Sequence, residues 1–177
     1  MSRALRRGRA WLRDENGAIT AEFVIVFPII VVLFLMSLEA SIAQLRIVMM
    51  DRALDLVVRE LRLGHLGEEP EPEEVRKHLC ARAMLIPNCE RDMTLEMRVI
   101  DRKSWTGFTL PPACINRVSK IRPPVDFTQG GINEVVTIRA CTVFDPIFPS
   151  THFGLALPRD ASGGYQIAAM SAFVNEP

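Results

Sequence analysis

The chain has 177 residues, of which 49% are hydrophobic and 24% are charged, and its formal net charge is zero. This hydrophobic content excludes a largely disordered chain, and the length suits one globular domain plus one apolar segment. The charge is unevenly placed, because arginine is concentrated at Arg3, Arg6, Arg7, Arg9 and Arg13. An apolar segment follows this cluster directly, so the sequence predicts membrane topology rather than nucleic-acid binding.

The apolar segment has the length of a membrane span. Residues 23–38, FVIVFPIIVVLFLMSL, carry no charge, and extension back to Ala18 adds Glu22 as the only ionisable group. Residues 18–38 rise about 31 Å as a helix, close to the ~30 Å hydrocarbon thickness of a bilayer. We therefore predict a transmembrane helix over residues 18–40. The positive-inside rule places the basic leader, residues 1–17, in the cytoplasm and the remaining chain outside it.

Two simpler interpretations of this segment stay open. One is a plain uncleaved anchor, which explains the span equally well. The other is a secretory signal peptide cut after Ala43, in the small-x-small triplet Ser41-Ile42-Ala43, which would release a soluble protein that begins at Gln44. The apolar run is longer than the 7–15 residues typical of a signal peptide. Neither interpretation explains why the acidic residue Glu22 lies in the apolar segment.

Glu22 is the residue of the span that needs an explanation. An acidic side chain near the centre of a membrane costs about 2.5–3.5 kcal/mol, less near an interface, so it normally has a partner. Cleavage of the bond between Gly17 and Ala18 would give Ala18 a free amine, with Glu22 one helical turn away. That amine, on the same chain or on a neighbouring one, would neutralise the carboxylate and set the register between subunits.

The leader that ends at Gly17, followed by Glu22-Phe23, resembles the cleavage motif of type IV prepilins. Together with the segment from Glu22 to Pro28 and the later Glu39-Ala40, it is similar to the TadE and TadF pseudopilins of tight-adherence (Flp) pilus assembly. This resemblance covers residues 13 to about 45. It implies cleavage by a prepilin peptidase and assembly with other pilins or pseudopilins at a pilus assembly platform. It also implies a single span in the lipid of the bacterial inner membrane, with the C-terminal domain in the periplasm. Pro28 is expected to bend the helix, because it removes one backbone donor.

Beyond the span, residues 41–67 are predicted to continue the helix and then form a linker. Apolar residues recur at a nearly helical spacing up to Leu63, and Gly64, Gly67 and the stretch 68–72 interrupt it. Residues 68–177 are predicted to form an α+β domain, with a short helix over 73–85 and strands over 93–101, 134–144 and 165–174. A small antiparallel sheet packed on the long helix is the simplest architecture, and it gives the ladle shape of pilins.

The 4 cysteines all lie in the part assigned to an oxidising compartment, so two disulfides are expected. Three pairings are possible. Cys80 with Cys89 and Cys114 with Cys141 close the shortest loops, and this layout is also similar to that of the pseudopilins. Zinc binding is the rival, weakened by the absence of C-x-x-C spacing and by scattered histidines.

No catalytic motif is present, whether a phosphate loop, a dinucleotide fingerprint, a zinc-protease helix or a nucleophile elbow. We therefore expect a protein that is not an enzyme and holds no cofactor or metal. A pseudopilin is the leading hypothesis, and an uncleaved anchored module that binds a periplasmic or envelope partner is the second.

Overall fold

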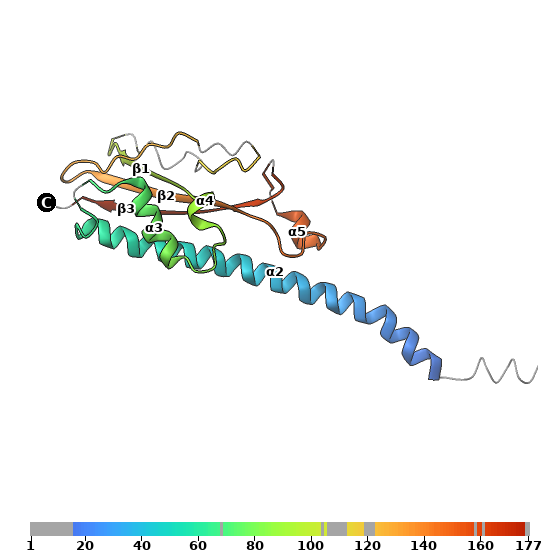
Figure 1. Ribbon diagram of the computed structural model, residues 1–177. Coiled ribbons are helices and arrows are strands. Elements are labelled where there is room, and N and C mark those ends of the chain that lie inside the picture. Colours follow the sequence, from blue (N-terminus) through green and yellow to red (C-terminus); the bar gives the residue numbers. More distant parts are fainter. Residues whose placement is uncertain are drawn as a thin grey trace, which may run out of the picture.

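The protein is built around one long helix and a small three-stranded sheet that packs against part of it, with short helices beside them (Figure 1). The computed structural model describes residues 16–67, 69–103, 105, 113–118, 123–157, 159–160 and 162–175. In chain order the elements are α2 (Asn16–Arg62), α3 (Pro72–Arg82), α4 (Cys89–Asp92), β1 (Thr94–Ile100), β2 (Val135–Phe144), α5 (His152–Ala156) and β3 (Tyr165–Val174). The α+β class predicted from the sequence is therefore present.

Helix α2 runs for 47 residues, which corresponds to about 70 Å. It passes through Pro28 without a break, and its ribbon curves gently toward the N-terminal end (Figure 1). Its C-terminal limit has a local cause: Gly64 adopts a φ of 68°, a left-handed conformation that glycine reaches at little cost. The sequence predicted this termination and the continuity of the helix across the end of the apolar run.

The sheet has the strand order β1-β2-β3, and both pairs are antiparallel. Strand β2 is central, and nearly all of its residues are buried. The three strands lie within one residue of the predicted segments at each end, because each carries the β-branched and aromatic residues that favour a pleated, buried surface.

One face of the sheet packs on the C-terminal half of α2 and forms the hydrophobic core. Alternate residues of each strand point to this face, and helix residues at a helical spacing meet them. The helix contributes Ala43, Met50, Ala53, Leu54, Val57, Val58 and Leu61, and the strands contribute among others Leu95, Met97, Val136, Ile138, Ala140, Ile167, Ala169 and Phe173.

The chain between β1 and β2 returns beside β1. The amide of Met97 donates to the carbonyl of Asp126, and that of Thr128 donates to the carbonyl of Met97, each at 2.9 Å. This pairing covers an edge that would otherwise expose unpaired backbone groups. A disulfide joins Cys114 of the same connection to Cys141 of β2, and a second joins Cys80 of α3 to Cys89 of α4. These are the pairings that close the shortest loops.

The helical details differ from the expectation in three places. Helix α3 ends at Arg82, not at 85, because the amide of Ala83 closes the last turn on Leu79 and Ala83 leaves the helical conformation. Helices α4 and α5 were not predicted. Both are single turns or little more, too short for a hydrophobic period to develop.

Candidate membrane and assembly segment

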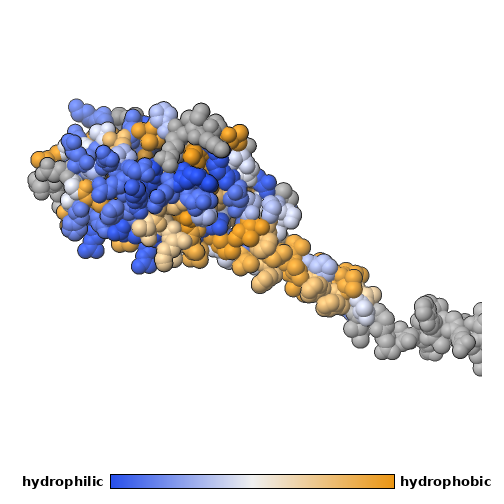
Figure 2. All heavy atoms as spheres, in the orientation of Figure 1, coloured by the Kyte–Doolittle hydropathy of each residue, from blue (hydrophilic) through white to orange (hydrophobic). Residues whose placement is uncertain are grey.

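The N-terminal half of α2 projects from the domain and presents an apolar surface. Residues 20–30 are all exposed, and no part of the most apolar stretch of the helix, with a mean hydropathy of 2.7, is buried within the protein. Figure 2 shows hydrophobic side chains along the projecting helix and mainly hydrophilic ones over the domain. By its length and composition this helix could cross a membrane.

Glu22 lies on this bare half of α2 and is exposed. Within the part of the chain that the structure describes, its carboxylate makes no ion pair or hydrogen bond. Phe23, its neighbour, stacks on Phe27 with ring centroids 5.0 Å apart. Gly17 and Ala18 belong to the first turn of α2, and the arginine-rich leader, residues 1–15, lies outside the described residues. An acid in an apolar, uncovered surface requires a partner from outside the described domain.

The alternative cleavage site after Ala43 lies inside the packed part of α2. Ala43 is buried in the core, and the helix continues without interruption for almost 20 further residues to Arg62. Cleavage there would remove the N-terminal half and cut a helix at a point where it packs against the sheet.

Glu39 marks the point where the projecting half of α2 meets the domain. Its side chain is completely buried, and its carboxylate accepts hydrogen bonds from the backbone amides of Ile147 at 3.1 Å and Phe148 at 2.8 Å. The connection between β2 and α5 is thereby tied to the helix. The sequence singled out Glu39 through the resemblance and as a carboxylate that a signal peptide would not need, and it gave Glu39 no structural role. Its position at the end of an uncharged helical run was the available indication.

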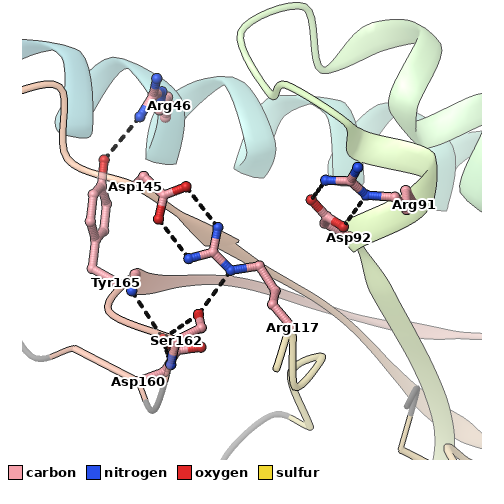
Figure 3. Close-up of polar contacts among 9 residues, drawn as sticks. Arg46, Arg91, Asp92, Arg117, Asp145, Asp160, Ser162 and Tyr165 are labelled. Atoms are coloured by element: carbon pink, nitrogen blue, oxygen red, sulfur yellow. Dashed lines mark hydrogen bonds and ion pairs between the residues drawn. The ribbon is translucent and has the colours of Figure 1, made fainter. Parts of the chain in front are cut away.

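Arg46 makes the next polar contact between α2 and the sheet, about two turns beyond Glu39. Its guanidinium donates to the hydroxyl of Tyr165 at 3.1 Å (Figure 3) and lies 4.8 Å from the centroid of the Phe144 ring. Phe144 ends β2 and Tyr165 begins β3, so this cation holds the end of the sheet nearest to Glu39. The two polar residues fix the helix to the sheet where the apolar surface ends.

Arg117 and Asp145 form a bidentate ion pair just after β2 (Figure 3). The two nitrogen–oxygen distances are 2.8 and 2.6 Å, and the Arg117 Nε also donates to Ser162 at 2.9 Å. The hydrogen bonds from Arg117 lower the pKa of Asp145 below its usual value, against a smaller opposing effect of burial. This group joins the cysteine-bearing connection to the loop before β3.

The described residues contain no cluster of three or more His, Cys, Asp or Glu side chains that could hold a metal ion. A hollow of about 550 Å³ lies at the end of the domain opposite to Glu39, lined among others by Glu69, Val99, Phe127 and Glu134. The Glu134 carboxylate already accepts the amide of Gly131 at 2.7 Å. Comparison with known proteins adds no relative: no family model, no curated protein and no solved structure matches this chain.

Proposed function

We propose that this protein is a membrane-anchored minor pilin or pseudopilin that takes part in assembly of a tight-adherence pilus. One observation carries the proposal: a single helix whose C-terminal half belongs to a folded domain and whose N-terminal half is apolar and largely exposed, with one acid, Glu22, that has no partner among the described residues. A plain anchor needs the apolar half but has no use for the acid. A ladle-shaped subunit that joins others through its helix needs both.

The position of Glu22 supports this proposal. The residue lies close to the cytoplasmic end of the apolar run, where an uncompensated carboxylate costs less than the ~3 kcal/mol at the bilayer centre but is still unfavourable. An amine created at Ala18 by cleavage would lie on the same helical face, at i and i+4. The same amine on a neighbouring subunit would pair with Glu22 and thereby fix the axial offset between the two helices.

The bare helical surface supports the same conclusion. In the membrane, lipid covers the exposed phenylalanine, valine and isoleucine side chains of residues 23–34. In an assembled fibre, helices of other subunits would replace the lipid, with the domain outside. Residues 20–30 are all exposed, so this part of the surface is free for either covering.

The first test is the N-terminus of the protein extracted from membranes of cells with and without a prepilin peptidase. Mass spectrometry should find a peptidase-dependent start at Ala18. A start at Met1 or Ser2 in both strains would contradict the pilin role and leave an anchored domain. A start at Gln44 would identify a secreted protein.

The second test replaces Glu22 by alanine and by glutamine, with Thr20→Ala as the matched control on the same exposed segment. Both Glu22 variants should insert into the membrane and fold, because Glu22 touches nothing in the domain. They should assemble poorly, whereas T20A should assemble normally. Normal pili in the Glu22 variants would remove the assigned role.

An uncleaved, anchored binding module is the second candidate, and the hollow lined by Glu69 and Glu134 is the observation that favours it. In that case the leader stays attached, and charge reversal at Glu69 and Glu134 abolishes capture of an envelope ligand. Peptidase-dependent cleavage distinguishes the two candidates.

A further inference from the structure

The connection between β2 and β3 lies against the membrane-facing part of α2. Glu39 binds the amides of Ile147 and Phe148, so these two residues sit at the height of Glu39 along the helix. Helix α5 follows them, contacts α2, and lies beside the middle of α2 beyond the end of the sheet (Figure 1).

The burial of α2 shows that one face of the apolar run is partly covered. Val31 and Leu35 are half-buried, and with Glu39 they form one helical face at the spacing i, i+4, i+8. Leu33 and Phe34, on other faces, are 61% and 64% exposed. The half-buried face therefore begins one to two turns below Glu39, toward the N-terminus of α2. Helix α5 contacts α2 and follows the loop bound at Glu39, so it is the candidate for the covering element.

The membrane depth of this connection follows from the helix itself. If residues 18–38 fill the ~30 Å of hydrocarbon, Glu39 lies at the outer boundary of the apolar layer. Ile147, Phe148 and α5 then lie at or slightly below that boundary. The remainder of the domain lies farther out, because β2 leads away from this end for 10 residues, or about 33 Å.

The composition of the connection fits such a position. No Asp, Glu, Lys or Arg occurs from Pro146 to Pro158. Ile147 is 45% exposed although it lies next to the buried Glu39, and Phe148 and Phe153 are half-buried. Arg159 begins the charged chain again and donates to the carbonyl of Gly154 at 2.7 Å, where its guanidinium can also reach lipid phosphates.

Several amides of this connection are already bonded, which lowers the cost of an apolar surrounding, where an unbonded amide is costly. Pro146 and Pro149 have no amide hydrogen. The amides of residues 147, 148, 151, 154 and 157 all donate within the protein, to Glu39, to backbone carbonyls or to the Thr151 hydroxyl. This loop is thus prefolded on α2.

We infer that residues 146–157 form a second membrane contact, which enters the outer interface of the phospholipid bilayer beside the spanning helix and fixes the orientation of the domain. The inference rests on the membrane anchoring in the proposed function. It assigns Ile147 as the side chain that contacts lipid. The hydrogen bonds from the amides of Ile147 and Phe148 to Glu39 hold the loop at that depth.

The test places tryptophan at three exposed apolar positions in a chain whose Trp11 and Trp105 are replaced by phenylalanine. Ile147→Trp probes the loop, Phe34→Trp probes the span, and Ile132→Trp is the matched control, a 65% exposed isoleucine beyond the opposite end of β2. The full-length variants are reconstituted in phosphatidylglycerol and phosphatidylethanolamine vesicles, with and without lipids brominated on the acyl chains. Far-UV circular dichroism verifies the fold of each.

Brominated lipid should cause loss of fluorescence in F34W and in I147W, and none in I132W. Loss in F34W without loss in I147W would overturn the second contact and leave the anchor intact. No loss in either variant would contradict both the anchor and the contact. Equal loss in I132W and I147W would also overturn the inference, because the contact would then not be localised.

Discussion

The two halves of α2 share one continuous backbone but have opposite surroundings. Leu33, in the N-terminal half, is 61% exposed, whereas Leu54, in the C-terminal half, is 1% exposed. Glu22 has no partner among the described residues, whereas Glu39 is bound by two backbone amides. The comparison shows that the hydrophobic residues of one helix can be buried in the core of the same chain in one half and left exposed in the other. The change from mostly exposed to mostly core-facing apolar residues occurs at Glu39.

The largest expected difference is between two variants that each replace one leucine by alanine, one in each half of α2. Leu54→Ala should lower the free energy of unfolding of the domain by about 2–5 kcal/mol, because it leaves a cavity under the sheet. Leu33→Ala should change it by less than about 0.5 kcal/mol. Guanidinium unfolding in detergent, followed by hydrogen exchange of the β2 amides, measures both. Similar losses in the two variants would mean that the N-terminal half also packs on the domain.

All the cysteines lie in the domain, so removing each disulfide measures the stability of the domain without changing the exposed half of α2. Replacing Cys114 and Cys141 by alanine should lower the free energy of unfolding by about 2–4 kcal/mol. Replacing Cys80 and Cys89 should cost about 1 kcal/mol less, since the sequence separations are 27 and 9 residues. The same unfolding assay applies, and an equal or reversed order would show that chain entropy does not dominate.

The two glutamates provide the next comparison. Glu39→Ala should lower the free energy of unfolding by about 1–3 kcal/mol, because the amides of Ile147 and Phe148 lose their acceptors in a buried place. Hydrogen exchange at these two amides should accelerate most. Glu39→Gln keeps one acceptor oxygen and should lie between the alanine variant and the native protein. Glu22→Ala, the control, should leave both amides and the unfolding free energy unchanged.

The smallest expected effect concerns the ion pair of Arg117 and Asp145, which joins the connection between β1 and β2 to the end of β2. Because the pKa of Asp145 is lowered in the folded protein, its contribution is complete above the unfolded value near 3.8 and is lost as the pH falls through the folded value. The Asp145 side chain is largely exposed, so this contribution is about 0.2–1 kcal/mol.

Unfolding measured from pH 6 down to pH 2 should therefore show a slightly steeper loss in the native protein than in Asp145→Asn. High salt should reduce the difference. A steeper loss in the variant would reverse the assigned direction of the shift.

Local patterns were sufficient to predict most of the elements. The period of apolar residues predicted the continuation of the helix past Leu38, and the runs of valine and isoleucine predicted the three strands. The short α4 and α5 helices and the end of α3 could not be predicted, since a cap and one or two turns carry too little pattern. For the site, the sequence pointed to Glu22 through its chemical cost in an apolar run, but it gave Glu39 no contact.

The sequence by itself determined the order and type of the main elements, the length of the apolar run and the placement of charge, because these depend on periodicity and composition along the chain. Only the tertiary structure decided which apolar residues are covered. That outcome depends on where the sheet meets α2, on the long-range bonds from Glu39 to Ile147 and Phe148, and on the contact of Arg46 with Phe144 and Tyr165. Such contacts join residues about 100 positions apart, so no local pattern encodes them.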